Sequence, residues 1–243
     1  MARVAAEHLL VLDAGHALLD SGALTGFQPG EVAAEALDRM GYDAVTLGSA
    51  DLATLGPEGI ARLRASAQFA LLSANAYPAG ADALAAAPYA FFDLGGRRVA
   101  VLGLSDARDA PGWEIRDPLR TTRRYVRELR RQADIIILLS HAGQNVDRQI
   151  ALQVRGIDVI VVGGNQLLDE PIRLGRDDTL LIHADRYSDG VAGQYLGQAE
   201  LTFDDAGRLA DYRWERVRLD VRVAEDPIIN RWLLWLEPSQ PTP

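Results

Sequence analysis

The chain is predicted to fold as an α/β protein, and three observations support this class. Its 243 residues are 48% hydrophobic, which is enough to bury a sizeable core. Over the first two thirds, short apolar runs alternate with amphipathic helical patterns, as in βα units whose strands are buried on both faces. We find no internal repeat and no linker long enough to divide the chain. A single core domain is therefore expected over residues 1–225.

The βα part is defined by apolar runs that end in polar or glycine residues, such as LLVLDAG at residues 9–15. Strands are expected at residues 9–15, 43–48, 69–75, 97–105, 133–143 and 156–164. Between them, apolar residues recur at spacings of three and four, which predicts helices. These helices are expected at residues 31–40, 57–65, 118–133 and 147–154.

The last third changes to strands joined by turns. Strands are expected at residues 179–185, 195–203 and 207–220, and Asp204 to Gly207 form the hairpin turn before the last of them. In that strand Tyr212 and Trp214 alternate with charged residues, so one face should be wetter. Residues 226–243 are expected to form a helix, at about 227–236, and a proline-rich tail.

Composition excludes several classes of function. A formal charge of −9 argues against broad binding to nucleic acid or to anionic membranes. The absence of cysteine excludes disulfides, thiolate metal sites and cysteine nucleophiles. No signal peptide and no membrane span is visible, so the chain is expected to be soluble and cytoplasmic.

Polar residues follow the expected strands at the edge where α/β proteins bind ligands. They include His16 after the first strand, Ser49 and Asp51 after the second, His141 after the fifth and Asn165 after the sixth. The sequence Ser105-Asp106 follows the fourth strand in the same way. These side chains are expected to converge on one site.

The order of these segments resembles the metallophosphoesterase domain of bacterial 5′-nucleotidases, which belong to the calcineurin-like phosphoesterase superfamily. The likeness covers about residues 8–220. It is carried by LLVLDAGHALLDSG, MGYDAVTLGSADLA, LLSANAY, ADIIILLSHAG, GIDVIVVGGNQ and YLGQAELTFDDAGRL. The resemblance implies a four-layer α/β/β/α sandwich whose two metal ions activate a water or hydroxide to attack a phosphate ester. It also implies that an N-terminal strand carrying an Asp-x-His motif is missing here, and that relatives are often exported.

Several metal-ligand motifs of this family fall on other residue types. The family's Gly-Asp, whose Asp bridges both metals, falls on Gly15-His16. Its Gly-Asn-His-Glu falls on Gly48-Ser49-Ala50-Asp51, and alanine can neither transfer a proton nor stabilise charge. The ligand histidine of the family's Ser-His loop is kept as His141, but the later Gly-His-x-His falls on residues 164–167 without any histidine.

Two hypotheses follow from these departures. The first is a non-catalytic member of the family that is retained as a binding or assembly module and holds no cofactor. The second is a phosphoester hydrolase with a remodelled site for one zinc, manganese or iron ion, built from His16, Asp51, His141 and Asn165, with Ser49 beside them. A retained loop histidine bonded to backbone is the structural alternative for His141.

Two further segments are candidates for binding a protein partner. The helix at residues 118–133 carries one basic stripe that includes Arg120, Arg124, Arg127 and Arg131, which either docks an acidic partner or is a solvated helix face. The last helix carries Trp232 and Trp235 among more apolar residues than one buried stripe needs. They are expected to pack on the domain itself, on a protein partner or on a second copy of the chain.

Overall fold

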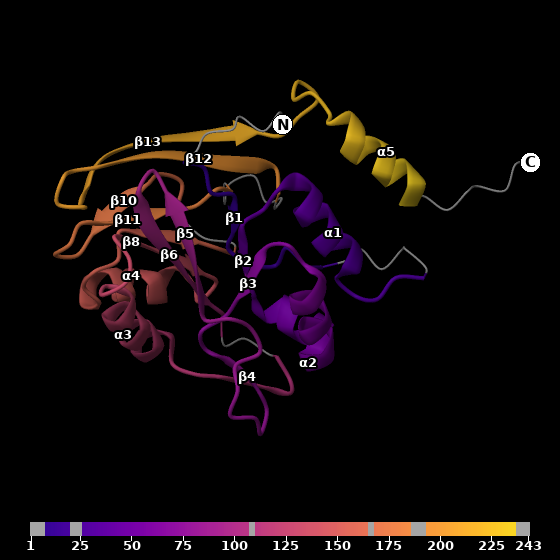
Figure 1. The fold of residues 1–243 in the computed structure, drawn as a ribbon, viewed down its shortest axis with the longest axis horizontal. Coiled ribbons are helices and arrows are strands. Elements are labelled where there is room, and N and C mark those ends of the chain that lie inside the picture. The colour runs from indigo at the N-terminus through magenta and orange to yellow at the C-terminus, as the bar shows by residue number, and fades with distance from the viewer. Residues whose placement is uncertain (1–7, 20–25, 107–109, 165–167, 186–192, 237–243) are drawn as a thin grey trace, which may run out of the picture.

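The computed structural model describes residues 8–19, 26–106, 110–164, 168–185 and 193–236, and it contains two main β-sheets (Figure 1). The first sheet is parallel, with the order β1-β2-β3. Its strands are β1 (Leu12–Asp13), β2 (Ala44–Thr46) and β3 (Ala70–Leu72), and the helices that follow β1 and β2 are α1 (Glu31–Met40) and α2 (Ser49–Ser66).

The second sheet has six strands in the order β10-β11-β9-β8-β6-β5. Four inner strands are parallel, and the two outer strands are antiparallel to their neighbours. The strands are β5 (Tyr89–Leu94), β6 (Arg97–Leu104), β8 (Ile135–Ser140), β9 (Val159–Val162), β10 (Ile172–Leu174) and β11 (Thr179–Ile182), and the helices are α3 (Pro118–Leu129) and α4 (Gln144–Gln153).

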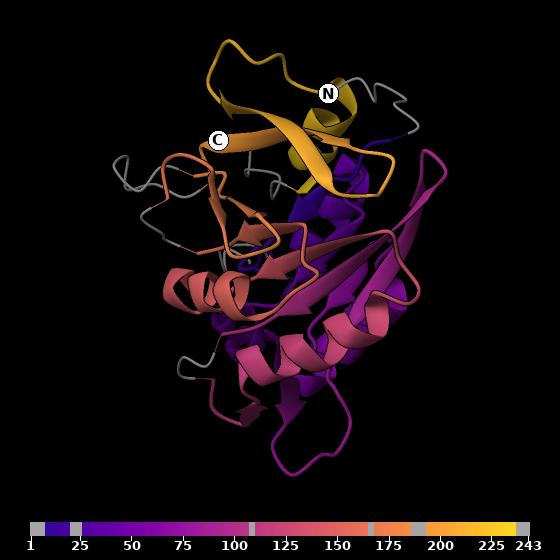
Figure 2. The same cartoon turned by 90° about the vertical axis from the view of Figure 1, so that its left-hand side faces the viewer.

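The two sheets lie between two layers of helices, with α1 and α2 on one side and α3 and α4 on the other (Figures 1 and 2). Strand β8 illustrates this arrangement. All six of its residues are buried, and alternate residues pack on opposite faces of the sheet. Ile136 and Leu138 pack in the cluster with α3 and α4, whereas Ile135, Ile137 and Leu139 pack between the sheets. This is the α/β/β/α arrangement that the resemblance implies.

Several elements differ from the sequence prediction. Helix α2 begins at Ser49 rather than near residue 57. It is interrupted at Gly56, which has a non-helical φ of 61° and lies directly before Pro57. Strand β5 was not expected, although Gly95 and Gly96 separate it from β6 and both adopt positive φ, as a tight hairpin requires. The short strands β4 (Ala76–Pro78) and β7 (Trp113–Ile115) were also not expected.

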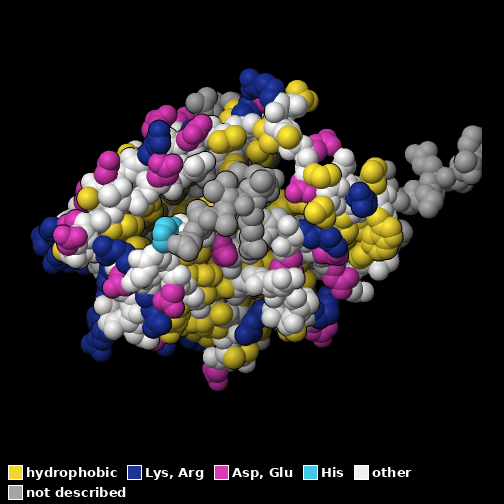
Figure 3. All heavy atoms as spheres, turned by 45° about the horizontal axis from the view of Figure 1, so that its top comes forward, with side chains coloured by type: hydrophobic (Ala, Val, Ile, Leu, Met, Phe, Trp, Pro, Cys, Tyr) yellow, Lys and Arg dark blue, Asp and Glu magenta, His cyan; other side chains and the backbone are white. Residues whose placement is uncertain are grey.

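In the C-terminal part, β12 (Tyr195–Phe203) and α5 (Pro227–Leu236) have their predicted bounds, and the last strand, β13 (Leu209–Arg218), is two residues shorter at each end than predicted. Strands β12 and β13 form an antiparallel pair, and α5 contacts α1. Figure 3 shows hydrophobic side chains gathered where α5 lies at the end of the molecule. In the part of the chain that the structure describes, no helix is long and apolar enough to cross a membrane.

The two sheets pack closely at Gly103 in β6. A Cβ there would lie 2.5 Å from the Cβ of Leu72 and 2.8 Å from Oγ1 of Thr46, closer than real Cβ atoms come. We therefore expect Gly103→Ala to lower the free energy of unfolding by about 1 to 3 kcal/mol, measured by urea denaturation. The control is Gly59→Ala in α2, where the nearest atom would lie 3.2 Å away and alanine favours the helix. An equal effect of both substitutions would contradict this account of the sheet contact.

Candidate functional site

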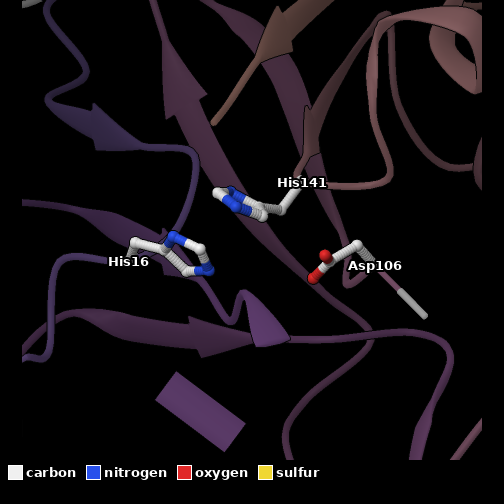
Figure 4. Close-up of side chains that lie close together, drawn as sticks. All are labelled: His16, Asp106 and His141. Carbon is white, nitrogen blue, oxygen red and sulfur yellow. The ribbon is translucent and has the colours of Figure 1, made fainter. Parts of the chain in front are cut away.

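Loops from both sheets meet at the carboxyl ends of the strands, and three of their side chains form one cluster (Figure 4). His16 follows β1 of the first sheet, whereas Asp106 and His141 follow β6 and β8 of the second. Metal-ligating atoms of the three side chains lie within 4.8 Å of one another. Asp106 and His141 are buried, and His16 is exposed. The cluster therefore lies where the sheets join and opens to solvent on the His16 side.

His141 is held by the backbone of the opposite sheet. Its Nδ1 lies 2.7 Å from the carbonyl oxygen of Ala14, and because a carbonyl only accepts, Nδ1 donates and Nε2 keeps its lone pair. Burial, followed by the charge of nearby His16, lowers the pKa of His141. The ring is therefore neutral near pH 7, which is the form that binds a metal ion.

His16 lies against His141 in an unusual backbone conformation. The ring centroids are 4.0 Å apart with an angle of 44° between the planes. His16 has a φ of 67°, a left-handed value that few side chains adopt. Its Nε2 accepts a hydrogen bond of 3.2 Å from the backbone N–H of Ala50, at the start of α2. The lone pair that would ligate a metal through Nε2 is therefore used by the helix.

Three glycines make room for the histidine pair. A Cβ on Gly15 would lie 2.6 Å from Nδ1 of His141, and a Cβ on Gly163 would lie 2.8 Å from the same atom. A Cβ on Gly48 would lie 2.9 Å from Cδ2 of His141 and would also clash with the ring of His16. The glycines at the strand ends thus allow backbone to pack directly on both rings.

Asp106 is bound to the first residue of α2. Its Oδ1 accepts from the backbone N–H of Ser49 at 2.7 Å, and its Oδ2 accepts from the Ser49 hydroxyl at 3.0 Å. The N-terminus of a helix favours such a carboxylate because its N–H groups carry partial positive charge. Sequence reasoning placed Asp106 at a strand end but did not include it among the site residues. The polar pair Ser105-Asp106 directly after an apolar strand is the sequence feature that could have identified Asp106 as a site residue.

Asp51 lies beside the cluster but serves the backbone. It is fully buried, and its two oxygens accept from the backbone N–H groups of Gly48, His16 and Leu18 at 2.8, 2.8 and 3.1 Å. Burial raises its pKa, and these hydrogen bonds oppose that rise. Asp51 thus fixes the loop that carries His16, while its predicted role as a metal ligand stays a prediction.

The remaining predicted residues lie elsewhere. Asn165 is outside the described residues. Arg120, Arg124, Arg127 and Arg131 are exposed on or just after α3, in the outer helix layer. In α5, Trp232 is buried, with the guanidinium of Arg39 over its ring at 4.9 Å, whereas Trp235 is 72% exposed. The two tryptophans therefore point in different directions, one onto the chain itself and one into solvent.

The chain resembles known proteins along most of its length. Residues 17–170 match the family model described as bacterial capsule synthesis protein PGA_cap. An uncharacterized metallophosphoesterase, YunD, of Bacillus subtilis is 31% identical over 83% of this chain and 44% of its own length. A probable 5′-nucleotidase of Treponema pallidum is 34% identical over 72% of this chain and 31% of its own.

Among solved structures, a 5′-nucleotidase precursor from Thermus thermophilus superposes with a TM-score of 0.76 at 26% identity. The match covers 93% of this chain and 48% of that one. The chain therefore spans less than half the length of these relatives. The predicted metallophosphoesterase-like fold is confirmed.

The loop that carries His141 is braced by a buried acid. The hydroxyl of Ser140 donates to Oδ1 of Asp147 at 2.5 Å and accepts from the backbone N–H of Ala142 at 3.2 Å. The other oxygen of Asp147 is buried and has no hydrogen-bond partner among the described residues. Burial raises the pKa of Asp147 to about 7, and the bond from Ser140 opposes that rise.

The raised pKa predicts that Asp147 costs stability at high pH. The folded state keeps the proton up to about pH 7, whereas the unfolded chain releases it near pH 4, so stability falls as pH rises between these values. Asp147→Asn cannot ionise. From pH 5 to pH 8, its free energy of unfolding should therefore rise relative to wild type by on the order of 1 to 3 kcal/mol.

Urea denaturation at both pH values measures this change. Asp211→Asn, at an exposed position of β13, is the matched control. A difference between Asp147→Asn and wild type that stays constant from pH 5 to pH 8 would show that Asp147 does not titrate in this range.

Proposed function

We propose that this chain, which belongs to the metallophosphoesterases, is a non-catalytic member that acts as a binding or assembly module. It matches the PGA_cap family model and is similar to 5′-nucleotidases. The observation that carries the proposal is the placement of His16. By the resemblance, this position holds the carboxylate that bridges two metal ions in active relatives. An imidazole cannot bridge two ions in that way, and two-metal hydrolysis depends on such a pair.

The surroundings of His16 support the same proposal. Its Nε2 accepts from Ala50, and its ring lies 4.0 Å from that of His141, so the two rings and the start of α2 form one packed unit. Ala50 occupies the position where the resemblance implies a histidine that stabilises the transition state. Its methyl group offers no proton and no charge. The side chains that would bridge the metal ions and protonate a leaving group are thus replaced by residues that pack on the backbone.

We expect no metal-dependent phosphoester hydrolysis. Purified protein with manganese, zinc or no added metal should hydrolyse p-nitrophenyl phosphate, bis-p-nitrophenyl phosphate and adenosine monophosphate only at the rate of the buffer. His141→Ala should behave in the same way, because no turnover depends on that ring. A metal-dependent rate well above the buffer rate that His141→Ala abolishes would refute the proposed function.

The second candidate function is a phosphoester hydrolase with one metal ion, and the cluster of His16, Asp106 and His141 favours it. Two imidazoles and a carboxylate are a donor set that zinc, manganese and iron accept. Three donors suit one ion rather than two, and among the described residues Nε2 of His141 is left available to ligate while its Nδ1 donates to Ala14. A bound ion would supply Lewis-acid chemistry. For His16 to ligate through Nε2, that atom would have to release the N–H of Ala50.

The metal content of the protein tests the second candidate. If it holds, elemental analysis and titration calorimetry should find about one zinc, manganese or iron ion per chain. Asp106→Asn should then weaken binding by about tenfold to a hundredfold, because one of three ligands loses its charge. The control is Asp158→Asn, which neutralises a carboxylate that pairs with Arg130 away from the cluster. Absence of bound metal, or equal affinity in wild type and Asp106→Asn, would rule out this candidate.

A further inference from the structure

The outer face of α3 carries a dense group of arginines that the proposed function does not use. Arg120, Arg123, Arg124, Arg127 and Arg131 are all exposed, and we call them the arginine face. They recur at spacings of three and four residues, so they lie along one side of the helix and the turn after it. The opposite side is buried through Tyr125, Val126 and Leu129, which pack toward the sheet.

The arginine face has no acidic partner within the part of the chain that the structure describes. None of its five guanidinium groups makes an ion pair there, whereas the neighbouring Arg130 binds Asp158 at 2.5 Å and the carbonyl of Gly156 at 2.6 Å. The nearby carboxylate of Glu128 accepts a hydrogen bond from the hydroxyl of Tyr89 at 3.1 Å. Five positive charges therefore face solvent together on a chain whose formal charge is −9.

Helix stability does not account for this arrangement. Arg120 lies in the first turn of α3, where cations are unfavourable because the helix N-terminus is itself partly positive. That turn contains no acidic residue, and its cap is the side chain of Asp117, which accepts from the N–H of Arg120 at 2.6 Å. Like charges at spacings of four, such as Arg120 and Arg124, destabilise a helix further. Arg120 and its spacing to Arg124 thus cost helix stability in the free protein, although Arg127 in the last turn is favoured by the helix dipole.

The arginine face borders a concave surface. Its five arginines, together with Glu128 and Gln132, line a groove of about 580 Å³. A second groove, of about 460 Å³, runs from Arg127 and Arg131 to Gln153 and Arg155 at the end of α4. Figure 2 shows the two helices side by side on this face of the molecule. A bound chain could therefore contact both helices.

We propose that the arginine face docks a carboxylate-rich segment of a partner protein. The guanidinium fork matches carboxylate geometry, and opposite charge would relieve the repulsion among the five arginines. Nucleic acid is disfavoured because the overall charge is negative and no residue that lines either groove is aromatic, so bases have nothing to stack on. A membrane surface is disfavoured because α3 buries its apolar side and presents only its charged side.

Fluorescence anisotropy tests the docking surface. The probe is a labelled 16-residue peptide with glutamates at alternating spacings of three and four. The competing probes are a single-stranded DNA oligonucleotide of equal charge and vesicles that contain phosphatidylserine. We expect the peptide to bind at 50 mM salt and to bind more weakly at 300 mM salt, since exposed charges are screened. The triple substitution Arg123→Gln, Arg127→Gln and Arg131→Gln should weaken binding by about tenfold or more.

A matched triple control separates this surface from overall charge. Arg62→Gln, Arg176→Gln and Arg218→Gln neutralise three exposed arginines outside both grooves and change the net charge equally. This control should change peptide affinity by less than about twofold. Equal weakening by both triples, no peptide binding at 50 mM salt, or tighter binding of the DNA or the vesicles would overturn the proposal. Circular dichroism of both triple variants checks that the fold is kept.

Discussion

The hydrogen bond between Nδ1 of His141 and the carbonyl of Ala14 is the interaction on which the rest of the site depends. It joins the carboxyl end of β8 in one sheet to that of β1 in the other, across 127 residues of sequence. It fixes which ring nitrogen carries the proton, and it places the ring among three glycines that leave no space for a Cβ. The same hydrogen bond thus holds the two sheets together at this edge and fixes the position of the candidate ligand His141.

The start of α2 is the second organising element of the site. Its first N–H groups are paired with acceptors from two other loops and from α2 itself, because helix ends have unpaired donors. Asp106 accepts a hydrogen bond from the N–H of Ser49, His16 accepts one from that of Ala50, and Asp51 accepts one from that of Gly48. In active metallophosphoesterases the resemblance implies that the positions of His16 and Ser49 serve metal ions. In this chain the same positions satisfy the backbone, which is why we favour a binding module over a hydrolase.

The arginine face and the end of α5 lie outside this site and give the chain two chemically different surfaces. The arginine face is charged and lies on the outer helix layer, whereas α5 exposes Ile228, Leu234 and Trp235 at the far end of the molecule. The charged surface has a clear complement in carboxylates, because guanidinium groups select them by both charge and shape. Apolar exposure on α5 specifies no such chemistry.

The sequence by itself determined the α/β class, the bounds of β12 and α5, and the loops at which polar residues gather. These features follow from local periodicity and from turn residues, which act over a few positions. Only the tertiary structure decided which polar residues meet. Ser49 and Asp106 lie 57 residues apart, and their bond depends on the register of β6 and the start of α2. The tertiary structure also decided that Asp51 accepts hydrogen bonds from backbone N–H groups and that Trp232 packs on α1, because burial and contacts depend on how the layers fit together.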